Sequence, residues 1–205
     1  MNRKFTIIAL SLLTTFAAQA QTKVSPGLRT GLNICRITQT KFDRRADFYI
    51  GGFVAIKFSP YYTMQPELTY SRQGATGVSY FYDEALGVNI PAEDNISIQY
   101  LSFAFVQKFT INNRFNVHLA PTMDVETGSN ISTNSDIDLG VLAGVGYTLP
   151  FGLTIEARVK KGLIDVVHSA DYNNPSDIYY VDNYNTNFIY QVGVSYNFEM
   201  TGTTD

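Results

Sequence analysis

The chain has 205 residues, of which 45% are hydrophobic and only 16% are charged, and its formal net charge is −3. The 14 Phe and 14 Tyr exclude a disordered chain, because they give it ample apolar surface to bury. The single Cys35 excludes a disulfide scaffold, and the slight acidity argues against nucleic-acid binding, which needs clustered Lys and Arg.

The first 20 residues have the layout of a secretory signal peptide. A short basic start precedes an apolar run over residues 5–17, and Ala18-Gln-Ala20 supplies a cleavage site between small residues. We therefore expect cleavage after Ala20 and a mature domain over residues 21–205. No later stretch has the roughly 18 consecutive apolar residues of a transmembrane helix. The sequence thus predicts an exported protein without a helical anchor.

The rest of the chain alternates between apolar and polar residues with period 2, and no helical period or internal repeat is present. The segments are about 10–12 residues long, which lets a tilted strand cross a bilayer. Eight of them follow one another, at approximately 28–38, 48–58, 63–73, 96–109, 115–125, 137–149, 153–159 and 188–198. Segment 115–125 is the clearest, because all its odd positions are apolar. The alternation predicts one all-β domain.

Two features disturb this pattern. Segment 96–109 changes phase near Tyr100-Leu101, which predicts a bulge or a shifted start there. Pro66 and Pro121 lie inside predicted strands, where each removes a hydrogen-bond donor from the ladder. The alternation around both prolines outweighs this loss, so we keep both segments as strands.

Short and long connections alternate along the chain. The short ones are 60–62, 111–114 and 150–152, and the longer, polar ones are 39–47, 74–95, 127–136 and 165–187. Outer-membrane barrels alternate in this way because every second connection is a periplasmic turn and the others are extracellular loops. The sequence therefore predicts an eight-stranded antiparallel up-and-down transmembrane β-barrel in the outer membrane of a Gram-negative bacterium.

Alternate positions of a strand point to the same face, and we call each such set of positions a phase. Charged and small residues share one phase of the predicted strands, and large apolar residues occupy the other. The charged residues of the polar phase are Arg29, Lys57, Lys108, Arg158 and Lys160, with Glu67, Glu156, Asp124 and Asp138. An ionisable group that faces lipid near the midplane costs roughly 2–4 kcal/mol, so this phase is predicted to face the interior. Eight strands enclose just enough room for side chains to fill it. A soluble periplasmic ligand-binding barrel, which would carry dense charge outside, is the alternative.

Four of the predicted strands carry family motifs. They read Gly27-Leu-Arg-Thr-Gly-Leu-Asn33, Gly51-Gly-Phe-Val-Ala55, Met64-Gln-Pro-Glu-Leu-Thr-Tyr-Ser-Arg-Gln-Gly74 and Tyr100-Leu101 through Lys108-Phe109. Together they resemble the PorT-like outer-membrane β-barrel family. The resemblance implies an integral outer-membrane barrel, makes Pro66 a family feature and carries no catalytic residues. The founding member is associated with protein secretion, so a secretion-associated barrel stays an open alternative.

The best candidate site is an inward polar network. Its members are Arg29, Lys57, Glu67, Lys108, His118, Glu156 and Arg158. One interpretation is a small porin with a gated ion path or a proton-handling pair of carboxylates. The other is a salt-bridged plug that holds a narrow barrel closed. Near-balanced charge favours the plug, because buried charges need partners whereas an ion-selective ring carries one sign.

The long loops are acidic and rich in Tyr. The possible recognition residues in them are Asp83, Glu84, Tyr172, Asp177, Tyr179, Tyr180 and Asp182. Such loops could bind a protein, a glycan or divalent cations, or could simply be solvated. His168-Ser169 suggests a lipid hydrolase, but adjacent residues of a strand point to opposite faces, so we expect no catalysis. The spacing of Cys35 and the two His residues fits no metal site, so no cofactor is expected.

The predicted role is therefore structural or interaction-based, through extracellular loops. We expect a monomer that contacts outer-membrane lipid and lipopolysaccharide and that meets the barrel-assembly machinery during insertion. A small porin, a secretion-associated barrel and an outer-membrane lipid hydrolase are the alternatives.

Overall fold

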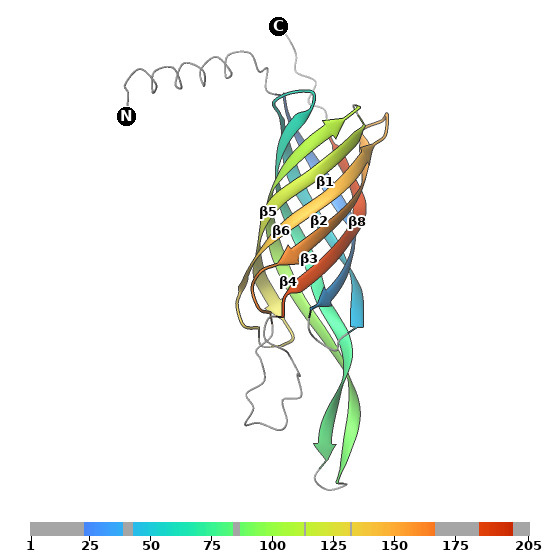
Figure 1. Cartoon of the computed structure of the whole chain (residues 1–205), viewed down its shortest axis with the longest axis vertical. Helices are drawn as coiled ribbons and strands as arrows, with labels where there is room; N and C mark the ends of the chain where they lie inside the picture. Colours follow the sequence, from blue (N-terminus) through green and yellow to red (C-terminus); the bar gives the residue numbers. More distant parts are fainter. Residues whose placement is uncertain are drawn as a thin grey trace, which may run out of the picture.

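Eight antiparallel strands close into one barrel in the computed structural model, which describes residues 23–38, 43–83, 87–112, 114–131, 133–166 and 185–198 (Figure 1). The strands are β1 (Lys23–Ile37), β2 (Asp43–Lys57), β3 (Tyr62–Asp83), β4 (Val88–Ile111), β5 (Phe115–Ser129), β6 (Ile137–Thr148), β7 (Leu153–Gly162) and β8 (Asn187–Asn197). Each strand pairs with its neighbours in the chain, and β8 pairs back to β1. The predicted all-β, eight-stranded up-and-down barrel is confirmed.

The two ends of the barrel differ. The connections 58–61, 112–114 and 149–152 are short and lie at one end, which we call the periplasmic end because outer-membrane barrels keep their short turns there. The opposite, extracellular end carries the connections 38–42, 130–136 and 163–186, and the short connection 84–87 at the tip of an extended hairpin. Among the described residues, no helix is long and apolar enough to cross a membrane.

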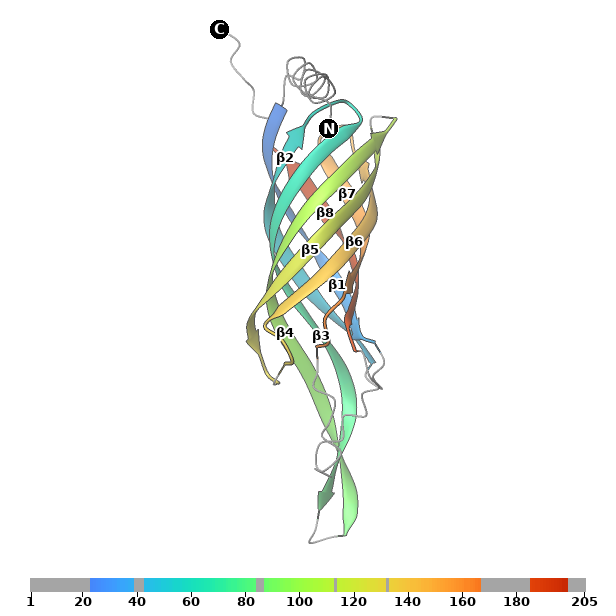
Figure 2. The same ribbon diagram turned by 60° about the vertical axis from the view of Figure 1, so that its left-hand side comes forward.

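The predicted loop 74–95 is wrong, because most of it is strand. β3 continues to Asp83 and β4 begins at Val88, and the two stay in register along this whole length. β2 pairs with β3 only as far as Thr76, and β5 pairs with β4 only from Ile98 onward. The hairpin therefore projects beyond the barrel, as Figure 2 shows from a second side. This extension of β3 and β4 could not be recognised in the sequence, because a two-stranded ribbon that packs against no core needs no regular apolar face.

The irregularity predicted near Tyr100-Leu101 is confirmed as a register shift between β4 and β5, but the change of phase along β4 that suggested it is wrong. The even positions from Ile96 to Lys108 are all buried, so β4 keeps one phase. The register shift falls on β5 instead, where Gln99 faces Gly128 but Tyr100 faces Glu126. The sequence misleads here because Ile96 and its neighbours are apolar residues that point inward.

Pro66 and Pro121 lie inside strands, as predicted. Beside Pro66 the ladder between β2 and β3 has a gap without a change of register, and the ladder between β4 and β5 has such a gap beside Pro121. On their other sides both prolines stay in register, with Phe105 and Val141 respectively. A proline nitrogen has no hydrogen to donate, so each ladder is weakened on one side only.

The outer wall is apolar and the interior is largely polar. Exposed outward residues occur on every strand and include Leu32, Ile50, Leu68, Phe105, Leu119, Val141, Ile155 and Val192. Buried inward residues include eight charged side chains, namely Arg29, Glu67, Lys108, Asp124, Asp138, Glu156, Arg158 and Lys160. The predicted assignment of the two phases is therefore confirmed, although Lys57 is exposed and not buried.

Candidate functional site in the barrel lumen

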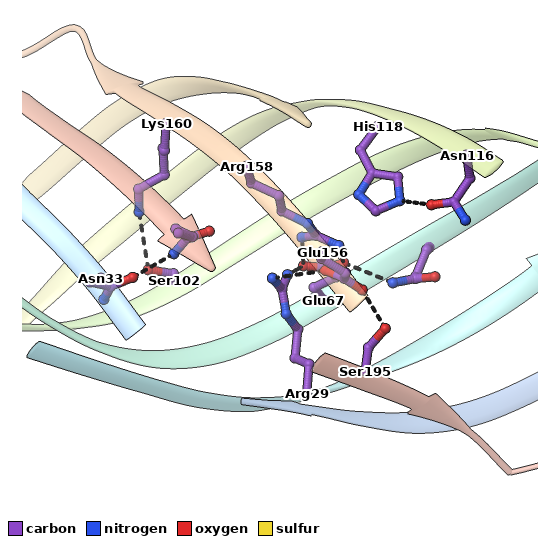
Figure 3. Close-up of polar contacts among 12 residues, drawn as sticks. Arg29, Asn33, Glu67, Ser102, Asn116, His118, Glu156, Arg158, Lys160 and Ser195 are labelled. Carbon is purple, nitrogen blue, oxygen red and sulfur yellow. Dashed lines mark hydrogen bonds and ion pairs between the residues drawn. The ribbon is translucent and has the colours of Figure 1, made fainter. Parts of the chain in front are cut away.

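Four charged side chains meet in the periplasmic half of the lumen (Figure 3). Arg158 Nη1 lies 2.8 Å from Glu67 Oε2, and Arg158 Nη2 lies 2.8 Å from Glu156 Oε2. Arg29 pairs with the same two carboxylates, at 3.4 Å from Glu156 Oε2 and in direct contact with Glu67 Oε2. Each guanidinium thus bridges both glutamates. We call Arg29, Glu67, Glu156 and Arg158 the ion-pair cluster.

The strands place this cluster by simple geometry. Glu156 and Arg158 are two residues apart on β7, so they point to the same side, while Glu67 reaches in from β3 and Arg29 from β1. A glycine leaves the room that Arg158 needs: a Cβ on Gly144 would lie 2.6 Å from Arg158 Cγ. The cluster therefore depends on a small residue on β6 as much as on the charges.

Hydrogen bonds complete the coordination of both carboxylates. Gln65 Nε2 donates to Glu67 Oε1 at 2.8 Å, and Ser195 Oγ donates to Glu156 Oε1. Every side chain of the cluster is at most 3% exposed. Because the charges are paired and also hydrogen-bonded, the cluster satisfies the conditions under which buried ions are tolerated.

A second polar layer lies between the cluster and the extracellular end. Lys160 donates to Asp124 Oδ2, and Gln73 Nε2 donates to the same oxygen at 3.1 Å. Asn33 Nδ2 donates to Ser71 Oγ, and Gln191 Nε2 donates to Asn33 Oδ1, each at 2.9 Å. Sequence reasoning placed Lys160 and Asp124 on the inward phase but missed the neutral members. The one signal that could have indicated these neutral residues is that they occupy inward positions of their strands, close to charged residues.

His118 and Lys108 line the periplasmic side of the cluster. His118 is buried, and its Nε2 lies 2.5 Å from Asn116 Oδ1. Lys108 is the register partner of His118 and is 7% exposed, but it forms no ion pair with any described carboxylate. Both residues therefore face inward as predicted, and the side chain of His118 is hydrogen-bonded to a neighbour on its own strand.

The prediction that Lys57 belongs to the interior network is wrong. Lys57 is the last residue of β2, its side chain is exposed, and its register partners are Lys23 and Thr63. It has the inward phase but lies at the periplasmic rim. The alternation along a strand shows on which face of the sheet a side chain lies, but not how far it lies from the end of the barrel.

The lumen becomes apolar toward the extracellular end. The buried side chains there are Ile37, Ala75, Ile96, Ile98, Tyr100 and Val166, and Ile131 packs against them. We call this set the apolar cluster. Asn187 marks its border, since its Nδ2 donates to Asp138 Oδ2 at 3.3 Å and lies 3.5 Å from the Tyr100 hydroxyl. Sequence reasoning missed the apolar cluster because it expected a uniformly polar interior.

Most predicted loop residues cannot be placed. Asp83 is the last residue of β3, and Glu84, Tyr172, Asp177, Tyr179, Tyr180 and Asp182 lie outside the described residues. The same is true of the signal-peptide segment and of His168-Ser169. Within the described ranges, no group of three or more His, Cys, Asp or Glu side chains could hold a metal ion, and Cys35 is buried with a free thiol.

The arrangement fills the barrel with balanced charge. The buried cations Arg29, Lys108, Arg158 and Lys160 match the buried anions Glu67, Asp124, Asp138 and Glu156 in number. No ring of one sign is formed by these described side chains, and ring charge of one sign is what selects ions in pores. The buried positive and negative charges of the lumen are therefore equal in number among the described residues.

Solved structures of several known outer-membrane proteins are similar to this chain. Neisserial surface protein A from Neisseria has a TM-score of 0.54 and 12% identity, over 85% of this chain and 99% of its own. Ail, the attachment invasion locus protein of Yersinia pestis, has a TM-score of 0.48 and 12% identity, over 86% and 99% of the two chains. OprG from Pseudomonas aeruginosa has a TM-score of 0.46 and 12% identity, over 89% and 99%. No curated protein sequence matches this chain significantly.

The family is shown by the sequence itself. The profile of the outer membrane protein beta-barrel domain matches residues 5–198, which is nearly the whole chain. Identities near 12% to solved structures speak for the fold alone, and the fold agrees with that family. The chain is therefore an outer-membrane barrel that belongs to the outer membrane protein beta-barrel domain family.

Proposed function

We propose that the protein is a closed outer-membrane barrel that acts through its extracellular end, in a structural or interaction role, and that it conducts no ions. The ion-pair cluster carries this proposal. Its guanidinium and carboxylate groups pair across the lumen from β1, β3 and β7, and none is more than 3% exposed. Removing one partner of a buried pair costs about 3–5 kcal/mol, so opening a path through the cluster is costly.

Single-channel recording in planar lipid bilayers tests the closed state. The purified protein is expected to give no stable open level at voltages where a porin of known conductance, used as the control, opens readily. A large and stable channel in the unmodified protein would overturn the proposal and favour the small-porin interpretation.

The projecting hairpin supports the interaction role. Beyond Thr76 its two strands pair only with each other among the described strands. A lone two-stranded ribbon is marginally stable in water, so contact with another molecule would stabilise it. The sequence from Gln73 to Ile98 contains four acidic residues and no Lys or Arg, which favours a cationic partner surface.

Site-specific photo-crosslinking in living cells tests this role. A photoreactive amino acid in place of Val88, which is 51% exposed at the tip of the hairpin, is expected to give crosslinks to macromolecules at the cell surface. The same group in place of Leu119, which is 56% exposed on the outer wall, is the matched control and should crosslink to lipid only. Equal protein crosslinking at both positions would contradict an interaction role of the hairpin.

We also infer two finer points of identity. The segment from Met64 to Gly74, with Pro66 inside β3, supports a place in the PorT-like branch of outer-membrane barrels. The basic and apolar start of the chain supports removal of a signal peptide after Ala20. The intact mass of protein extracted from outer membranes tests the second point, because a mature chain that starts at Gln21 has one defined mass.

A further inference from the structure

Three cations lie in one row on the outer wall near the extracellular end. Phe188 on β8 is the register partner of Arg36 on β1 and also of Lys161 on β7. The register between β1 and β2 ends at Cys35 and Arg45, so Arg36 and the exposed Arg44 are the first residues beyond it on the two strands. All of these side chains have the outward phase of their strands. We call Arg36, Arg44 and Lys161 the cationic row.

An aromatic ring and two hydroxyl groups organise part of this row. Arg36 Cζ and Lys161 Nζ each lie 5.9 Å from the centre of the Phe188 ring, a distance at which cations are attracted to an aromatic face. Lys161 Nζ donates to Thr186 Oγ1 and lies 3.4 Å from Thr38 Oγ1. Thr38 and Thr186 are themselves tied together, with Thr38 N donating to Thr186 O at 2.9 Å.

The cationic row has no acidic counterpart in the described part of the chain. Neither Arg36, Arg44 nor Lys161 forms an ion pair there. Two other arginines at the same end behave differently, since Arg45 and Arg72 lie 3.0 and 3.6 Å from the carboxylate of Asp47. The positive charge of the row is therefore not neutralised by these carboxylates, in a chain whose net charge is −3.

Apolar side chains of the outer wall lie directly below the row. The next outward residues toward the periplasmic end are Ile34 on β1, Tyr190 on β8 and Val159 on β7, all at least 36% exposed. Charged side chains are costly within hydrocarbon, whereas aromatic residues gather where hydrocarbon meets the headgroups. The row therefore lies at headgroup height, directly above an apolar surface suited to acyl chains.

We propose that the cationic row binds the phosphate group of an anionic lipid of the outer leaflet, while Thr38 and the buried Thr186 hold the Lys161 ammonium in place. Arginine presents a planar fork of donors that matches phosphate oxygens, and lysine adds a point charge. The acyl chains of the same lipid lie along the apolar wall below. The site deepens the contact with membrane lipid and does not depend on whether the lumen is closed.

Binding of defined lipids to the detergent-solubilised full chain, measured by native mass spectrometry, tests this proposal. The probes are diphosphorylated lipid A and the same lipid without its phosphates. The double variant Arg36→Gln/Lys161→Gln is expected to bind the phosphorylated lipid about 30-fold more weakly, or roughly fivefold for each cation lost. Its affinity for the dephosphorylated lipid should stay close to that of the unmodified protein.

The matched control is Lys57→Gln/Arg72→Gln, which removes the same charge from the periplasmic rim and from a carboxylate-paired position. It should keep the preference for phosphorylated lipid, and heat-modifiable gel mobility confirms that each variant is folded. Equal binding by the unmodified protein and the double variant would overturn the proposal. Competition by millimolar inorganic phosphate as effective as that by lipid would also overturn it, because the site would then recognise free phosphate.

Discussion

Two clusters in the lumen are held together by different chemistry. In the periplasmic half, two arginines and two glutamates pair in alternation, and each guanidinium contacts both carboxylates. In the extracellular half, six buried residues, mostly isoleucine and other apolar side chains, pack together without any ion pair among themselves. Ion pairs are directional, so the loss of one member leaves buried charge behind, whereas apolar packing loses only the contacts of the atoms removed. The same lumen therefore has one cluster that tolerates small changes and one that does not.

The largest expected effect comes from Glu67→Ala. This change leaves Arg29 and Arg158 without one of their two carboxylates, so we expect a loss of about 3–5 kcal/mol in the free energy of unfolding. Urea unfolding in detergent, followed by heat-modifiable gel mobility, measures it. Lys57→Ala is the control, because that exposed side chain should change stability by about 0.5 kcal/mol or less. Equal losses for both variants would show that the ion-pair cluster contributes nothing special.

An intermediate effect is expected in the apolar cluster. Ile98 has no measurable exposure, so Ile98→Ala should cost about 2–5 kcal/mol, while Ile98→Val should cost only about 0.5–1.5 kcal/mol. Glu67→Gln, which preserves the shape of Glu67 but removes its charge, should in contrast keep most of the loss seen with alanine. Equilibrium unfolding of the four variants checks this contrast. If Glu67→Gln is milder than Glu67→Ala by as much as Ile98→Val is milder than Ile98→Ala, the proposed difference between the two clusters is wrong.

The smallest expected change in unfolding free energy comes from adding a methyl group on the inner or the outer surface of the barrel wall. Gly144→Ala would put a Cβ 2.6 Å from Arg158 Cγ, so we expect a loss of about 1–3 kcal/mol from overpacking. Gly52→Ala faces outward, where the nearest atom to the new Cβ is 3.6 Å away, and should gain about 0.4–1 kcal/mol. The two unfolding free energies should therefore change in opposite directions. A stabilised Gly144→Ala would mean that Arg158 can shift without loss.

The strands and their two faces could be predicted from the sequence because a membrane wall divides residues sharply. Hydrocarbon excludes charge from one phase, so Arg29, Glu67 and Arg158 had to point inward together. Their mutual contacts were not fixed in this way, since which inward residues meet depends on register and tilt around the closed barrel. The depth of a side chain along the barrel axis could not be predicted for the same reason. This is why Lys57 was wrongly placed in the interior.

Two further differences have a common cause. A change of phase was predicted because Ile96 and Ile98 are apolar and were therefore assumed to face lipid. The extracellular end of the lumen, however, also contains apolar side chains, and both residues belong to them. The hairpin beyond Thr76 looked like a loop because it leaves the barrel, where neither lipid nor a packed interior imposes alternation. Periodicity is informative only where two different environments lie on the two sides of a strand.

The ion-pair cluster also has a consequence for the order of folding. Arg29 on the first strand meets Glu156, which follows it by 127 residues, so their contact forms only after the last strands have joined the first. Contacts of such long sequence separation form late, because the entropy of closing the chain must be lost before they are gained. We expect the cluster to be absent from the folding transition state. Losing a charge there should then accelerate unfolding while leaving the rate of insertion nearly unchanged, which makes this pairing a determinant of how long the barrel lasts once it is built.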